Sequence, residues 1–177
     1  RNSRPTVDVA LIVMHEDRIL LGEKKKSKSQ GRVWDLPGGA VEYMEKIERC
    51  AKREPYEEAG LKLELIDNEP FAATDDFYET GKHEITLLYR AVPIGNHEPR
   101  LKEKEKFHQW AYFPIDELPR RLSVTVENFL KKVGKVTKAD LRAIVERKQV
   151  DMNTENMEAA MRTVAGTAKN MGIEVIE

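Results

Sequence analysis

Short apolar runs separated by polar turns indicate strands near the start of the chain. Residues 7–14 (VDVALIVM) are mostly β-branched or apolar, and Pro5 and the polar residues 15–17 bound them. This pattern predicts a buried strand. Residues 18–21 (RILL) follow the polar turn at once, so they predict the hairpin partner of that strand.

The next segment, residues 22–32 (GEKKKSKSQGR), contains five basic residues and no apolar one. Such a composition is typical of a flexible, solvated loop. The alternative is a positively charged segment that binds phosphates, because it leads directly into Trp34 and a glycine pair. Lys24 and Lys25, nearest the preceding strand, are the best placed for that role.

The second half of the domain predicts further strands and a closing helix. Alternation and β-branched content predict strands, two of which form a hairpin across the turn at 79–82. The predicted strands are residues 61–66, 71–77, 83–92 and 109–113; 115–118 predict one helical turn, and 124–132 predict a helix. Together with a helix in the middle of the chain, these elements predict an α/β/α sandwich with a mixed sheet.

That central helix lies in residues 36–61 (LPGGAVEYMEKIERCAKREPYEEAGL), which open on a glycine pair. The pattern predicts a helix from about Glu45 to Gly60. Three carboxylates, Glu54, Glu57 and Glu58, share one face of it because positions three and four apart are neighbours. Such a cluster repels itself unless a cation lies among the carboxylates, and oxygen ligands favour Mg²⁺ or Mn²⁺. The spacing therefore predicts a metal site.

Several neighbours of this cluster have predicted roles of their own. Arg53 can reach Glu57 at i+4 and orient it. Gly38 and Gly39 permit backbone conformations that a β-carbon forbids, so a carbonyl can join the metal ligands. Cys50 lies on the same helix and is expected to be a buried structural thiol.

Pro55 interrupts the predicted helix directly after Glu54. A proline inside a helix removes a backbone donor and clashes with the preceding turn. It is either an apolar residue that packs against the core, or a kink that resets the distance between Glu54 and the following pair of glutamates.

Composition adds only broad limits. The chain has 177 residues, of which 40% are hydrophobic and 34% charged, with a formal net charge of −1, so bulk charge favours no particular partner. A single cysteine excludes an internal disulfide framework and favours a reducing cytoplasm. No apolar run approaches the length of a membrane span, and we expect no signal peptide and no membrane partner.

The spacing of Gly39, Glu45, Arg53, Glu54, Glu57, Glu58 and Gly60 resembles the Nudix box at all seven of its fixed positions. Pro55 is the departure, because the box has an aliphatic residue there. The resemblance extends from residue 6 to about residue 131, through the stretches LLGEKKKS, GRVWDLPGG, KHEITLLY and QWAYFPIDELP. Within the family the chain looks most like the members that remove unwanted nucleoside triphosphates.

The resemblance implies a metal-dependent pyrophosphohydrolase that acts on a nucleoside diphosphate linked to another group. Mg²⁺, with Mn²⁺ as the alternative, would be held by Glu54, Glu57, Glu58 and the Gly39 carbonyl. The ion would neutralise phosphate charge and lower the pKa of a bound water that attacks phosphorus in line. Lys24 or Lys25 would add positive charge at the leaving phosphates. The identity of the second substrate group and the oligomeric state stay open.

The general base and the role of His83 each have alternative assignments. The general base is either a box glutamate, Glu58 first, or a glutamate on the loop before the late strand, Glu105 and then Glu103. His83 is either a surface histidine at a strand start or a contact for a nucleobase or phosphate.

Residues 133–177 look like the end of the RNA-binding C-terminal domain of the large ribosomal subunit's protein eleven. The segment GTAKNMGI (residues 166–173) is the most characteristic run. The pattern predicts two helices, the first capped by Thr137 with Asp140 and the second by Asn153 or Thr154, after a short hinge at 133–135. We therefore expect a Nudix domain at 1–132 and a helical tail at 133–177.

Two interpretations of this tail remain. It is a helical appendage or fusion remnant, or it contacts RNA. The rival to an enzyme is accordingly a non-catalytic Nudix scaffold that binds RNA or the ribosome through the tail.

Overall fold

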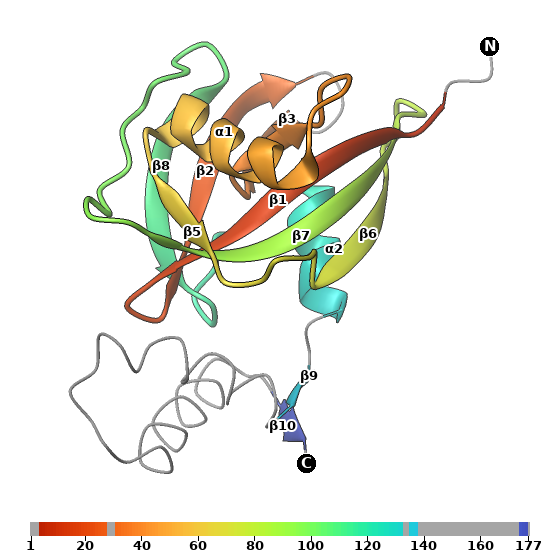
Figure 1. Cartoon of the computed structure of the whole chain (residues 1–177). Helices are drawn as coiled ribbons and strands as arrows, with labels where there is room; N and C mark the ends of the chain where they lie inside the picture. The colour runs from red at the N-terminus through yellow and green to blue at the C-terminus, as the bar shows by residue number, and fades with distance from the viewer. Residues whose placement is uncertain (1–3, 28–30, 133–134, 138–173, 177) are drawn as a thin grey trace, which may run out of the picture. The chain divides into compact units, whose positions relative to one another are not determined.

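The computed structural model describes residues 4–27, 31–132, 135–137 and 174–176. The chain divides into two compact units, Arg1–Phe129 and Leu130–Glu177 (Figure 1). The candidate site lies wholly in the first unit.

The first unit is built on one mixed sheet of eight strands with the order β3-β2-β1-β7-β5, to which β4, β6 and β8 add on β1, β7 and β2. Strands β1 and β7 are parallel over eight residue pairs, from Thr6↔Glu84 to Val13↔Ala91. All other pairs of this sheet are antiparallel. The strands are β1 (Thr6–His15), β2 (Arg18–Ser27), β3 (Gly31–Asp35), β4 (Gly38–Ala40), β5 (Leu63–Leu65), β6 (Ala72–Phe77), β7 (His83–Pro93) and β8 (Phe107–Pro114).

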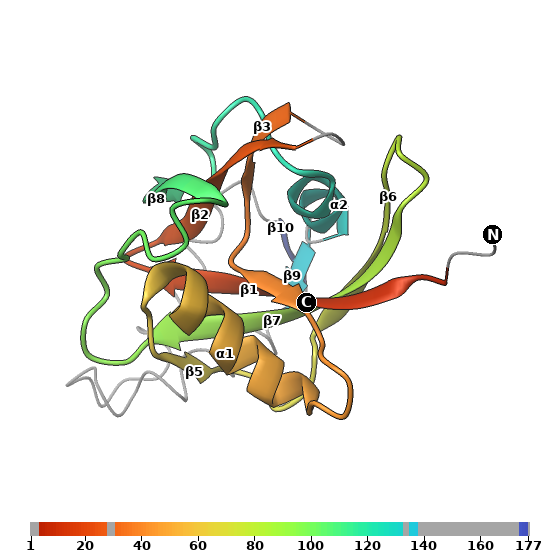
Figure 2. The ribbon, with the colours of Figure 1, turned by 90° about the horizontal axis from the view of Figure 1, so that it is seen from above.

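Helices α1 (Ile47–Ala59) and α2 (Val124–Lys132) cover opposite faces of this sheet, as the view in Figure 2 shows. Cys50 and Ala51 of α1 are buried in the same core cluster as Val9 and Leu11 of β1. On the other face Thr125 of α2 donates a hydrogen bond to Asp76 of β6 at 2.8 Å. The predicted α/β/α sandwich with a mixed sheet is confirmed. No helix among the described residues is long and apolar enough to cross a membrane.

Helix α1 ends where the sequence predicts. Gly60 adopts a left-handed backbone conformation with φ of 69°, and its N–H donates to the Tyr56 carbonyl. Pro55 is buried, and the helix continues through it to Ala59. This burial agrees with the interpretation of Pro55 as a residue that packs against the core.

Two predictions about the first unit are wrong. Residues 22–27 are not a loop but the second half of β2, because β3 and β8 pair with them on both sides and satisfy their backbone groups. Residues 115–118 form a turn rather than a helical turn; there the N–H of Glu117 donates to the carbonyl of Pro114.

In the second unit β9 (Lys135–Thr137) and β10 (Glu174–Ile176) form a parallel pair. The prediction of a wholly helical tail is therefore wrong at its two ends, and Lys135 belongs to a strand rather than to a hinge. The alternation of apolar residues at each end is too short to distinguish a three-residue strand from a helix terminus. The two predicted helices and their caps after Thr137 lie outside the described residues.

Candidate active site

The glycine pair of β4 brings the sheet and α1 into close contact. Gly38 pairs with Ala10 and Gly39 with Val9 on β1. A β-carbon on Gly38 would overlap the carbonyl oxygen of Val9, and φ at Gly38 is 152°. A β-carbon on Gly39 would lie 2.5 Å from the carboxyl carbon of Glu54. Glycine at position 38 therefore permits the close approach to β1, and glycine at position 39 leaves room for the Glu54 carboxylate.

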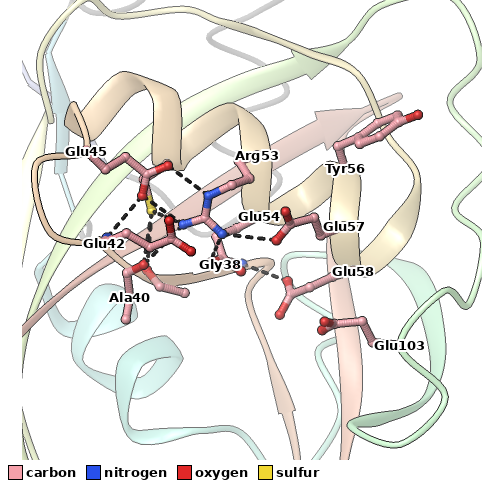
Figure 3. A network of polar contacts seen from close by, with 12 residues as sticks. Gly38, Ala40, Glu42, Glu45, Arg53, Glu54, Tyr56, Glu57, Glu58 and Glu103 are labelled. Atoms are coloured by element: carbon pink, nitrogen blue, oxygen red, sulfur yellow. Dashed lines mark hydrogen bonds and ion pairs between the residues drawn. The ribbon is translucent and has the colours of Figure 1, made fainter.

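Arg53 is the cation among the carboxylates of α1 (Figure 3). Its Nη1 atom lies 2.6 Å from Oε1 of Glu54 and 3.0 Å from Oε2 of Glu57. The predicted Arg53–Glu57 contact is confirmed, and Glu54 shares the same nitrogen. The helix therefore offsets the mutual repulsion of Glu54 and Glu57 with its own arginine.

Glu45 fixes the other side of the Arg53 guanidinium. Its two carboxylate oxygens accept hydrogen bonds from Nε and Nη2 of Arg53, each at 2.8 Å. Its Oε2 also accepts the backbone N–H of Glu42 at 3.1 Å. The hydrogen bonds from Arg53 lower the pKa of Glu45 to about 2. Glu45 thus remains charged and orients the arginine that orients Glu54 and Glu57.

Glu58 has a different environment. It is 3% exposed, and its Oε2 accepts the backbone N–H of Gly38 at 3.0 Å. Burial, with the charges of Glu54 and Glu103, raises the pKa of Glu58 to about 8 against the opposing effects of the Gly38 hydrogen bond and the Lys24 charge. A pKa of about 8 lies close to neutral pH, which suits proton transfer.

The three carboxylates among the predicted metal ligands contact different partners. Glu54 and Glu57 contact Arg53, whereas Glu58 contacts Gly38. Within the described part of the chain no three His, Cys, Asp or Glu side chains are gathered as a ligand set. Glu57 has 49% of its side chain exposed, so its carboxylate is the one with most freedom to turn.

The loop before β8 brings a fourth glutamate to the site. The backbone N–H groups of Arg100 and Lys102 donate to the carbonyls of Ala59 and Glu58 at 2.8 and 3.3 Å, which ties the loop to the end of α1. Figure 3 shows the Glu103 side chain beside Glu58. Oε2 of Glu103 lies 2.8 Å from Nζ of Lys106. Glu105 is exposed.

Lys24 and Lys25 are the two lysines predicted to bind phosphate. Lys24 forms an ion pair with a buried aspartate. Nζ of Lys24 lies 2.6 Å from Oδ2 of Asp35, a residue that is 7% exposed. Oδ1 of Asp35 accepts the hydroxyl of Ser123 at 2.5 Å. Lys25 is exposed.

His83 contacts its own hairpin. Its ring stacks on Phe77 with centroids 4.3 Å apart, and Nε2 lies 3.3 Å from Oδ1 of Asp75. These contacts agree with a surface histidine at a strand start.

A NUDIX domain model matches residues 3–133, most of the chain. The chain belongs to the NUDIX family. The MutT NUDIX hydrolase from Burkholderia pseudomallei is 30% identical, with a TM-score of 0.65 over 74% of this chain and 99% of that one. This Nudix protein is therefore a hydrolase of phosphoanhydrides.

More distant structures show the same fold. The MutT protein from Methanosarcina mazei Go1 is 18% identical, with a TM-score of 0.61 over 75% of this chain and 94% of that one. An ADP-ribose pyrophosphatase from Streptococcus suis 89-1591 is 20% identical, with a TM-score of 0.51 over 72% and 90% of the two chains.

A second family model, the RNA binding domain of ribosomal protein L11, matches residues 124–175 of this Nudix hydrolase. The two matches overlap at residues 124–133, which include all of α2. The resemblance of the tail is confirmed, and it begins one helix earlier than the sequence analysis placed it.

Asp35, which pairs with Lys24, and Ser123, which donates to Asp35, were not among the predicted site residues of this Nudix protein. One signal was present in the sequence, a serine directly before a predicted helix. Cys50 is fully buried, and burial raises its pKa to about 12. The prediction of a structural thiol is confirmed.

Proposed function

We propose that this Nudix hydrolase uses Mg²⁺, with Mn²⁺ as the alternative ion, to cleave a nucleoside diphosphate linked to another group. Nucleoside triphosphates are the leading substrate class. The observation that carries this proposal is the placement of three α1 carboxylates beside β4: Glu54 lies against Gly39, Glu58 accepts the N–H of Gly38, and Glu57 shares Nη1 of Arg53 with Glu54.

The residues present fit a hard divalent cation. Every candidate ligand is an oxygen, from Glu54, Glu57, Glu58 and the Gly39 carbonyl, and oxygen donors select Mg²⁺ or Mn²⁺ over zinc. The space a Gly39 β-carbon would occupy is directly against the Glu54 carboxylate. When bound, the ion supplies positive charge that offsets the phosphate oxygens and favours deprotonation of the attacking water.

The protein's own groups divide the remaining tasks. Glu58, whose pKa burial raises to about 8, accepts the proton of the attacking water, since a base near neutral pKa is the most effective one. Glu103 lies beside Glu58 and is the second candidate, ahead of Glu105, which is exposed. Lys24 offers positive charge to the leaving phosphates.

A substrate panel tests this function. Nucleoside triphosphates, dinucleoside polyphosphates, nucleotide sugars and capped RNA are incubated with the full chain, with Mg²⁺ or with a chelator. We expect hydrolysis with Mg²⁺ only, measured as pyrophosphate from nucleoside triphosphates and as released nucleotide from the other classes, and the highest kcat/KM for a nucleoside triphosphate. Absence of turnover on every class would refute the proposal.

A second candidate function rests on the match of residues 124–175 to an RNA binding domain. In this alternative the chain associates with RNA or the ribosome, and the Nudix scaffold is not catalytic. Titration of a labelled ribosomal RNA fragment with the full chain, at two salt concentrations, tests it. Salt-dependent binding without hydrolysis on the substrate panel favours this alternative.

A further inference from the structure

A buried chain of polar contacts links Lys24 to the start of α2. Lys24 donates to Oδ2 of Asp35, while Ser123 donates to Oδ1 of the same carboxylate at 2.5 Å. The backbone N–H of Leu36 donates to Oδ1 as well, at 2.9 Å. Asp35 is thereby fixed by its own strand end and by the residue before α2.

Backbone hydrogen bonds hold the two ends of this chain together. The N–H of Ser123 donates to the carbonyl of Trp34 at 2.9 Å, and the N–H of Trp34 donates to the carbonyl of Arg121 at 2.8 Å. The Ser123 hydroxyl also accepts the N–H of Val126 at 3.2 Å, so it caps α2. The position of Asp35 is therefore determined by β3 and by α2 jointly.

Lys24 is surrounded by acidic groups from several elements. Asp35 comes from β3, Glu58 from α1, Glu84 from β7 and Asp8 from β1. Burial disfavours the ammonium, but the charge and hydrogen bond of Asp35 outweigh burial and raise the pKa of Lys24. The lysine side chain is 41% exposed, and an ammonium has three N–H donors, so donors remain for a ligand after Asp35 is bound.

We propose that Asp35, held in place by Ser123, is the positioning residue that keeps Lys24 charged and directed at the phosphates of the substrate. This inference rests on the proposed function for the identity of the substrate. A side chain as flexible as lysine gains most from such a partner, because otherwise ordering it at the site costs rotamer entropy.

The first experiment measures the pKa of Lys24 without substrate. The full chain is labelled at the lysine ε-carbons, and the Lys24 signal is assigned by its loss in Lys24→Arg. We expect the wild type to keep this pKa above the ordinary lysine value of about 10.4, and Asp35→Asn to lower it by about one pH unit or more. Equal values in both proteins would overturn the proposal.

The second experiment follows kcat/KM between pH 6.5 and 9.5 on the best substrate of the panel. We expect Asp35→Asn to lose about tenfold or more, with the loss growing toward alkaline pH as Lys24 deprotonates. Asp35→Asn combined with Lys24→Arg should remove that alkaline loss, because a guanidinium stays charged. Glu23→Gln is the matched control: it removes the contact with Arg32, 3.6 Å across the same two strands, and should leave the profile unchanged.

The outcomes separate the two proposals. A wild type without hydrolase activity refutes the proposed function, yet the pKa comparison still tests whether Asp35 controls Lys24. A lowered pKa with unchanged kcat/KM at every pH overturns the role toward substrate. If Asp35→Asn does not fold, a wild-type Lys24 pKa at or below the ordinary value refutes the proposal by itself.

Discussion

The Glu58 carboxylate accepts the backbone N–H of Gly38 at 3.0 Å, across twenty residues of sequence, in a position that is 3% exposed. One neutral donor does not compensate for the loss of solvent around a carboxylate. The pKa of Glu58 is consequently raised to about 8, so its charge changes between neutral and mildly alkaline pH.

The first prediction concerns pH and stability without metal. The folded-state pKa of Glu58, about 8, lies above its ordinary value, so the stability that protonated Glu58 contributes is complete below that ordinary value and is lost as pH rises through about 8. We expect the Tm of the metal-free protein to fall between pH 6 and 9, and Glu58→Gln to reduce the fall. Mg²⁺ should raise the Tm more at pH 9 than at pH 6. Parallel curves for both proteins would contradict this assignment.

The second prediction concerns the carboxylates on α1. Glu57→Gln and Glu58→Gln should each lower kcat by about 10² or more, because each removes a ligand charge. Glu48→Gln, in the first turn of the same helix, is the control and should keep full turnover. Near-native turnover of both box variants at saturating Mg²⁺ would show that the metal site is misassigned.

The third prediction concerns the glycine beside Glu54. Gly39→Ala places a β-carbon 2.5 Å from the Glu54 carboxyl carbon, so Glu54 must move. We expect kcat to fall by about tenfold or more and the Mg²⁺ concentration for half-maximal activity to rise. Gly95→Ala is the control, because its β-carbon meets none of the described atoms within 4 Å, although its φ of 72° makes it mildly destabilising. Unchanged metal dependence in Gly39→Ala would argue against Glu54 as a ligand.

The fourth prediction concerns Pro55. Because Pro55 is buried inside a continuous helix, Pro55→Leu should stabilise the protein by roughly 1 to 3 kcal/mol without a change in turnover. Thermal midpoint and kcat are measured together, with Pro55→Ala to separate helix propensity from the larger leucine volume. A stabilised variant with lower kcat or an altered metal preference would indicate a functional kink instead.

The fifth prediction concerns the tail. Every residue that we assign to the site lies between Lys24 and Ser123, within the unit Arg1–Phe129. A chain that ends at Lys132 should fold and keep kcat/KM within about threefold of the full chain. An insoluble truncated protein would show that the two units share one core. A large rise in KM alone would indicate that the tail contacts the substrate.

The sequence by itself determined the box helix and its chemistry, because those relations are local. The i, i+3 and i, i+4 spacing places Glu54, Glu57 and Glu58 on one face of α1, and the Arg53–Glu57 contact follows from the same periodicity. The end of α1 at Gly60 was equally predictable, since a glycine permits the left-handed conformation that terminates a helix.

Only the tertiary structure decided which groups from distant segments meet at this helix. The polar composition of residues 22–27 predicted a loop, but β3 and β8 on either side provide backbone partners, which composition does not reveal. In the same way Asp35 acquires Ser123, 88 residues away, because strand β3 and the start of α2 are hydrogen-bonded side by side. Glu103 lies beside Glu58, because its loop is tied to the last carbonyls of α1, whereas Glu105 of the same loop is exposed. Hydrogen bonds between residues far apart in sequence have no local pattern, so the full set of partners became visible only in the folded chain.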